Sequence, residues 1–236
     1  MQDLPSQPFL GWRHTMDAFE SGLACYCHQS QNEVNRIRRF SQSIDSHWES
    51  KAKRLDIDLE KSLANTTCED RRQELGETYG MFYYEAIVKS EWIHRHSVVI
   101  TISSFVENSL HELCVLLASR TNKSLKLPQR KGMSKVEKCL LYLECNAGLC
   151  LAECKEESEA MITTYRLRNQ IVHNNGKVTE QFEKQKAQWK GLVKGSLGAY
   201  IEIDSEFITW YLDQVAAFYY KLSTEVSLFI TRTKLA

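Results

Sequence analysis

The stretch HSVVITISSFVENSLHELCVLLASRT, residues 96–121, decides the fold class of this chain. Its first half is rich in β-branched residues, and VVITI at 98–102 taken alone would suit a buried strand. No glycine or proline interrupts the stretch, and apolar residues continue through FVENSLHELCVLLA without a turn signal. A segment this long, apolar on more than one side, is typical of a helix at the centre of a bundle or against a partner subunit.

The chain before this stretch also has a helical pattern. From about residue 9 to 63, apolar residues recur at intervals of three, four and seven with charged residues between them. A second helix is expected from about 69 to 120, with an interruption near Gly80 or Ser90. Thr67 is the expected N-cap residue between the two helices.

The C-terminal part contains one clear loop and further helices. TNKSLKLPQRKGM at 121–133 is predicted to be the loop, and Ser134 is expected to cap the helix that follows it. A short strand is expected near 199–203, before a final aromatic-rich helix. The fold class predicted is therefore all-α, with residues 1–90 as a helical N-terminal extension and residues 91–236 as a helical domain.

Composition excludes several classes of protein. The 30 basic and 30 acidic residues give a formal net charge of zero, whereas proteins that coat duplex DNA usually carry a basic excess. No apolar run reaches the roughly 20 residues that span a bilayer. The N-terminal residues lack the basic and apolar regions of a secretory signal. We therefore expect a cytoplasmic protein with no membrane partner.

The cysteines and most histidines do not form a recognisable site. The 8 cysteines lack the paired spacing of a structural zinc site and suit free thiols in a reducing compartment. His94 and His96 are two positions apart, so they point to different sides of a helix and are expected on its charged surface. We expect neither a metal ion nor a cofactor.

The segment RLRNQIVHNNG, residues 166–176, is the best candidate for chemistry. A histidine titrates near neutral pH and can move a proton to or from a ribose 2′-OH or a leaving 5′-oxygen. An arginine offers a permanently charged fork to the phosphate. Arg168 and His173 are five positions apart, about 140° around an ideal helix, whereas Asn169 and Arg166 lie closer to the His173 face.

A purely structural interpretation also fits this segment. Protonated histidine and arginine are favoured near a helix C-terminus by the helix dipole, without any function. Asn174, Asn175 and Gly176 are residues that accept the left-handed conformation at the end of a helix. The pattern alone does not separate the two interpretations.

RNQIVH at 168–173 resembles the R-N-x-x-x-H motif of HEPN domains, and the NNG that follows resembles the usual continuation in that family. The resemblance covers about residues 90–236. It implies a helical bundle that homodimerises and brings two copies of the motif into one cleft. Many HEPN proteins are metal-independent endoribonucleases that act as toxins or in antiviral defence, so the resemblance implies RNA, either tRNA or single-stranded RNA, as the substrate.

Residue roles follow from the same resemblance. His173 would be the general acid or base, Arg168 would contact the scissile phosphate, and Asn169 would hold the motif in shape. Arg166 is the second candidate for the arginine role, and Glu107 is a candidate acidic residue near the motif. RNA contacts are expected from the residues Lys126, Arg130, Lys131 and Asn174.

Two other functions remain open for this motif. HEPN domains also serve as non-catalytic dimerisation or nucleotide-binding modules, and some are subunits regulated by a separate sensor or antitoxin. NNGKVTE at 174–180 has no tyrosine, which members paired with a nucleotidyltransferase antitoxin often carry after the histidine. That absence argues against this one form of regulation.

Overall fold

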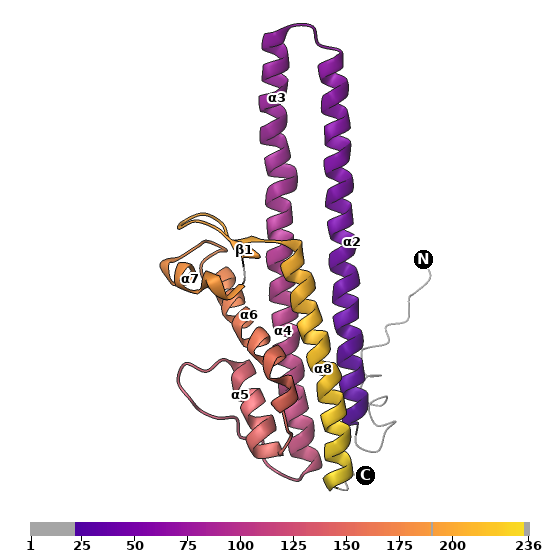
Figure 1. The fold of residues 1–236 in the computed structure, drawn as a ribbon, viewed down its shortest axis with the longest axis vertical. Coiled ribbons are helices and arrows are strands. Elements are labelled where there is room, and N and C mark those ends of the chain that lie inside the picture. Colours follow the sequence, from indigo (N-terminus) through magenta and orange to yellow (C-terminus); the bar gives the residue numbers. More distant parts are fainter. Residues whose placement is uncertain (1–21, 190, 234–236) are drawn as a thin grey trace, which may run out of the picture. The chain divides into compact units, whose positions relative to one another are not determined.

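A computed structural model describes residues 22–189 and 191–233 of the chain (Figure 1). The first part of the helical stretch expected from residue 9, residues 9–21, lies outside the described residues. The helical elements are α2 (Leu23–Ala64), α3 (Glu69–Tyr83), the π turn η1 (Tyr84–Val88), α4 (Lys89–Arg120), α5 (Lys135–Tyr142), the π turn η2 (Leu143–Ala147), the 3₁₀ turn η3 (Ala152–Cys154), α6 (Lys155–His173), α7 (Glu180–Gln185), the 3₁₀ turn η4 (Lys186–Trp189) and α8 (Ser205–Thr233). Two strands accompany them, and the all-α prediction is confirmed.

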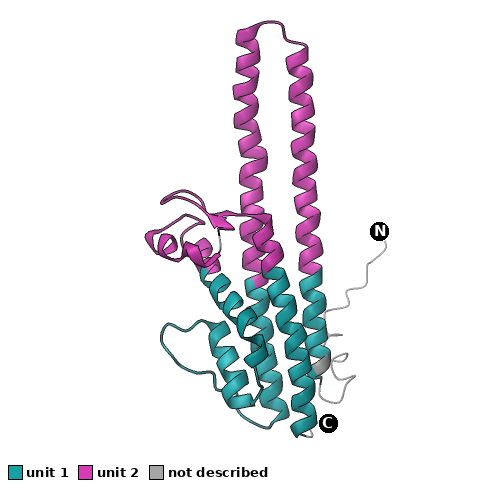
Figure 2. Ribbon diagram, in the orientation of Figure 1, with its two compact units in different colours: residues 1–35, 103–166, 211–236 teal, residues 36–102, 167–210 magenta. Residues whose placement is uncertain are grey.

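The described chain divides into two compact units (Figure 2). Unit 1 contains residues 22–35, 103–166 and 211–233, and unit 2 contains residues 36–102 and 167–210. Because the units interleave along the sequence, they are not sequential domains. The division at residue 90 stays a prediction.

Helix α4 is buried on more than one side, as its sequence predicts. The β-branched run that resembled a strand is part of this helix. Its buried apolar residues include Val98, Val99, Ile102, Val106, Leu110, Leu113, Cys114 and Leu117.

Unit 1 places the aromatic residues of α8 in its core. Tyr211 and Tyr219 are fully buried, and both hydroxyl groups have partners on α4. Ser103 shares a 3.4 Å hydrogen bond with Tyr211, and Ser109 shares one with Tyr219. Buried hydroxyl groups are costly unless they are paired, so these serines explain how two tyrosines fit the core.

Helix α5 begins with the cap that the sequence predicts. The Ser134 hydroxyl accepts a 3.1 Å hydrogen bond from the Glu137 amide, and the Glu137 carboxylate accepts one of 2.7 Å from the Ser134 amide. This reciprocal capping box satisfies two backbone N–H groups that a helix start otherwise leaves without a partner.

The N-cap predicted for α3 was wrong by one residue. Cys68 has the extended conformation of an N-cap, and its carbonyl accepts the first helical hydrogen bond, from the Arg72 amide at 3.1 Å. No side chain caps this helix, and none of its residues is buried. The acidic residues Glu69 and Asp70 lie in the first turn, where the helix dipole favours them.

The interruption expected near Gly80 or Ser90 is a π turn rather than a break. Residues Tyr84–Val88 adopt wider π geometry between α3 and α4, so the helical stretch continues from Glu69 to Arg120. A single π turn inserts one extra residue into an α-helix and often marks a functional site. The stretch is long and apolar enough, by length and composition, to cross a membrane, but half of its most apolar window is buried in the protein.

The short strand expected near 199–203 is present. Strand β2 (Glu202–Ile203) pairs antiparallel with β1 (Val193–Lys194), with Val193 opposite Ile203. The side chains of Val193 and Ile203 are both buried. This small sheet leads directly into α8.

Candidate functional site

Helix α6 carries the candidate motif and ends at His173. Asn175 and Gly176 then take the left-handed conformation, with φ of 51° and 69°. The Gly176 amide donates to the Ile171 carbonyl at 2.8 Å, which closes the last turn of the helix as in a Schellman motif. The left-handed ending expected of this sequence is therefore confirmed.

His96 holds this turn in place from α4. Its Nε2 lies 2.7 Å from the Ile201 carbonyl oxygen, and the Ile201 amide donates to the Gly176 carbonyl at 2.7 Å. The ring leaves no space for a side chain at Gly176, where a Cβ would lie 2.8 Å from Cε1 of His96. Burial lowers the pKa of His96, against a smaller opposing effect of the Ile201 carbonyl.

The expected surface position of His94 and His96 was wrong. His94 is 8% exposed, and burial is the main reason that its pKa is lowered. Its Nδ1 lies 3.5 Å from a carboxylate oxygen of Asp45. His96 is partly buried against the Ile201 carbonyl, so neither imidazole is fully exposed although the two point in different directions.

Gln170 fixes the other side of the turn. Its side chain is buried, and its amide oxygen accepts hydrogen bonds from Asn174 Nδ2 at 2.8 Å and from the Thr179 hydroxyl at 3.1 Å. The amide of Asn174 is thus occupied within the protein, and this residue shapes the turn. Its contact with RNA stays a prediction.

The two candidate arginines have different partners. Arg168 Nη1 donates a 3.0 Å hydrogen bond to Oδ1 of Asn169. The guanidinium of Arg166 is half-exposed and lies 3.9 Å from the carboxylate of Glu137. Arg168 is therefore hydrogen-bonded to another residue of the motif, whereas Arg166 is directed toward Glu137 at the start of α5.

His173 is exposed, whereas the side chains of His96 and Gln170, which hold the turn, are partly or fully buried. It forms no hydrogen bond or ion pair with any residue of 22–189 or 191–233. An imidazole in this state is accessible to a ligand from solvent. The fold around it holds the backbone, while the ring has no hydrogen bond or ion pair to lose within the described residues.

The remaining predicted site residues, Glu107, Lys126, Arg130 and Lys131, belong to unit 1. Glu107 pairs with Lys135 at 3.3 Å in unit 1, whereas His173 belongs to unit 2. The loop residues Lys126, Arg130 and Lys131 are exposed. Their roles near RNA stay predictions.

Within the described residues, no group of three or more His, Cys, Asp or Glu side chains could hold a metal ion.

All eight cysteines are free thiols. Cys114 and Cys139 are buried near each other, and the Cys114 thiol donates to the Cys139 carbonyl at 3.6 Å. Their contact raises the pKa of Cys114 and lowers that of Cys139.

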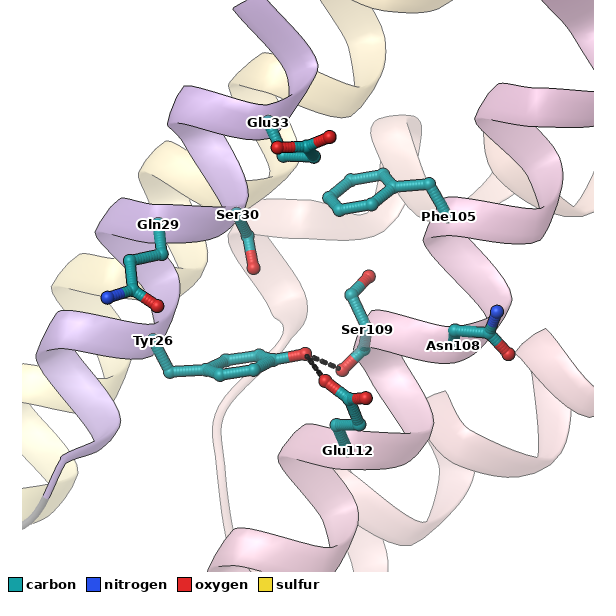
Figure 3. Close-up of a pocket in the computed structure, with 8 residues that line it drawn as sticks. All are labelled: Tyr26, Gln29, Ser30, Glu33, Phe105, Asn108, Ser109 and Glu112. Carbon is teal, nitrogen blue, oxygen red and sulfur yellow. Dashed lines mark hydrogen bonds between the residues drawn. The ribbon is translucent and has the colours of Figure 1, made fainter. Parts of the chain in front are cut away.

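Unit 1 contains a separate pocket of about 250 Å³ between α2 and α4 (Figure 3). The Tyr26 hydroxyl closes one end, donating to the Ser109 carbonyl at 2.8 Å and lying 3.1 Å from the Glu112 carboxylate. Burial, together with Tyr219 and Glu112, raises the pKa of Tyr26. The phenol therefore stays protonated and acts in this pocket as a hydrogen-bond donor.

The sequence interpretation missed two residues that shape the site, His96 and Gln170. A signal for His96 existed, because Trp92, His96 and Val99 follow the four- and three-residue spacing of one helix face.

No protein-family model, curated protein or solved structure matches this chain.

Proposed function

We propose that this protein is a metal-independent endoribonuclease of the HEPN type that acts as a toxin or defence effector. The ribose 2′-oxygen forms a bond to phosphorus while the bond from phosphorus to the 5′-oxygen breaks. The 2′-OH loses its proton to a base, and the leaving 5′-oxygen gains one from an acid. His173 performs one of these transfers, and the products are a 2′,3′-cyclic phosphate and a 5′-OH.

The exposure of His173 is the observation that carries this proposal. The residues beside it are held by His96, Gln170 and the left-handed turn. A general acid or base must reach the atom whose proton it moves, and it must be held within hydrogen-bond distance of that atom. An accessible imidazole meets the first requirement, and a fixed backbone limits the positions that the ring can take.

Arg168 is favoured over Arg166 for the phosphate. Asn169 is four positions before His173, so both lie on one face of α6. The hydrogen bond from Arg168 to Asn169 draws the guanidinium toward that face. This contact offsets the 140° or so that separates Arg168 from His173 on an ideal helix.

A homodimer completes the proposed site, as the family resemblance implies. Mixing His173→Ala with Arg168→Ala tests this directly. If each site takes Arg168 from one protomer and His173 from its partner, random exchange restores about a quarter of wild-type activity. If both residues come from the same protomer, the mixture stays inactive.

The primary experiment is a cleavage assay in EDTA with labelled tRNA and single-stranded RNA. Wild type is expected to leave 2′,3′-cyclic phosphate ends, and His173→Ala is expected to leave the RNA intact. His28→Ala is the matched control, because His28 is also an exposed histidine on a helix.

Circular dichroism on the same samples separates catalysis from folding. The melting temperature of His173→Ala should be close to that of wild type, because the exposed ring has no hydrogen bond or ion pair within the described residues. An intact RNA substrate with folded wild-type dimer would overturn the proposal. Cleavage by His173→Ala at the wild-type rate would overturn it as well.

A further inference from the structure

Three aromatic side chains of unit 2 form a continuous row. Trp92 of α4 lies between Tyr84 of the π turn η1 and Tyr200, which precedes β2. Its ring centroid is 5.8 Å from that of Tyr84, with the rings at 87°, and 5.9 Å from that of Tyr200, at 35°. Both tyrosines remain open to solvent, at 42% and 45% exposed. These residues are named the aromatic row.

Tyr200 is fixed next to the turn that follows His173. Its backbone forms an isolated antiparallel bridge with Lys177. A ring atom of Tyr200 would lie 3.8 Å from a Cβ on Gly176, three residues after His173. The backbone pairing fixes the position of Tyr200, so one end of the row lies beside the turn that follows the proposed catalytic histidine.

Positive charge accompanies the row. The Lys89 ammonium lies 5.5 Å from the ring centroid of Tyr84, within the range of a cation–π contact. It also pairs with Glu85, which offsets its charge. Lys177 is exposed and has no ion pair within residues 22–189 and 191–233, so it contributes a charge that no acidic partner neutralises.

We infer that the aromatic row binds unpaired nucleobases of single-stranded RNA, with Tyr200 stacking on a base next to the cleaved phosphodiester. This inference rests on the proposed ribonuclease function. Aromatic rings stack on any base, and a nearby lysine meets the adjacent phosphate, which is the usual arrangement in proteins that bind single strands. Bases inside a duplex are already stacked and cannot occupy the row, so the substrate is an unpaired segment.

Fluorescence anisotropy with a labelled 2′-fluoro oligonucleotide tests binding apart from cleavage, because this probe has no 2′-OH nucleophile. Tyr200→Ala is expected to weaken its binding by about tenfold to a hundredfold, the usual effect of losing one aromatic stacking contact. Tyr200→Leu keeps apolar bulk but lacks a ring, and should weaken binding similarly. Tyr200→Phe should bind like wild type. The matched control is Tyr220→Ala, which removes a tyrosine that is 69% exposed in unit 1.

The outcomes separate this inference from the proposed function. Wild-type binding to the single strand, weakened by both Tyr200→Ala and Tyr200→Leu, supports the row even if no RNA is cleaved. Equal binding by wild type and folded Tyr200→Leu would overturn the inference that the aromatic row binds bases. Cleavage by wild type would still support the proposed ribonuclease function. No binding by wild type, or equal binding to a duplex of the same sequence, also overturns it. If Tyr200→Leu changes only the dimer fraction in sedimentation, the row is a contact between copies and the inference is wrong.

Discussion

Gly176 and His96 are in direct contact, although 80 residues separate them in the sequence: a Cβ at Gly176 would lie 2.8 Å from Cε1 and 2.9 Å from Nδ1 of the imidazole. The glycine also has φ of 69°, which side chains disfavour. Two independent requirements therefore select glycine at the end of the motif. This contact connects α4 to the position of His173.

Gly176→Ala is expected to lower the free energy of unfolding by roughly 2–4 kcal/mol, from the left-handed backbone and from crowding. Urea denaturation followed by circular dichroism measures the loss. Gly198→Ala is the control, because Gly198 has φ of 82° but no atom within 4 Å of its added Cβ. It should show only the backbone part, about 1–2 kcal/mol.

Repeating the substitution in a His96→Ala background measures the part of the loss that comes from crowding between the new methyl group and the His96 ring. Gly176→Ala should cost less there, with a coupling energy of about 0.5–3 kcal/mol, since the methyl group then has space. Equal cost in both backgrounds would mean that the imidazole does not constrain Gly176.

Arg168→Lys is expected to lower kcat about a hundredfold to a thousandfold with little change in stability, because lysine cannot offer two parallel donors to the phosphate. Arg166→Lys should retain most activity, since its guanidinium is directed to Glu137. Single-turnover cleavage of the same RNA compares them. A larger loss from Arg166→Lys would assign the phosphate contact to Arg166 instead.

Stability is expected to fall as the pH is lowered from about 7.5 to 5.5, around the ordinary histidine pKa of about 6.5. Burial lowers the pKa of both His94 and His96, so the unfolded chain binds more protons in this range. The stability from keeping the two rings neutral is complete above the ordinary pKa and is lost as the pH falls through it toward the folded values.

Urea midpoints at the two pH values measure this dependence. The double variant His94→Gln and His96→Gln should flatten it, whereas His28→Gln, which changes an exposed ring, should leave it unchanged. If the double variant keeps the full wild-type dependence of stability on pH, groups other than His94 and His96 cause that dependence.

Ser134→Ala is expected to destabilise the protein by about 1 kcal/mol, the usual value of an N-cap hydrogen bond. Thermal unfolding measures it. Ser124→Ala is the control, because Ser124 is exposed in the preceding loop and outside any helix. Equal melting temperatures for the two variants would show that the capping box adds nothing to stability.

Local sequence patterns predicted the helices well. The capping box of α5 and the left-handed end of α6 each depend on residues within a few positions of one another. The same holds for the apolar spacing that identified α4 as a helix rather than a strand. Such features can be read from the sequence because neighbours along the chain decide them.

Contacts between distant segments could not be predicted in this way. The hydrogen bond between His96 and the Ile201 carbonyl joins residues 105 positions apart, and no local sequence pattern predicts it. The sequence did place His94 and His96 on different sides of a helix, but it could not show that His94 lies near Asp45 and that His96 binds the Ile201 carbonyl. The hydrogen bond that distinguishes Arg168 from Arg166 also required coordinates.

The interleaving of the two units has a consequence for the inheritance of this protein. The chain passes between units at residues 35/36, 102/103, 166/167 and 210/211, each time within one of the helices α2, α4, α6 and α8. Neither unit is encoded by one continuous stretch of gene. A single continuous segment exchanged between genes therefore cannot transfer one whole unit to another protein.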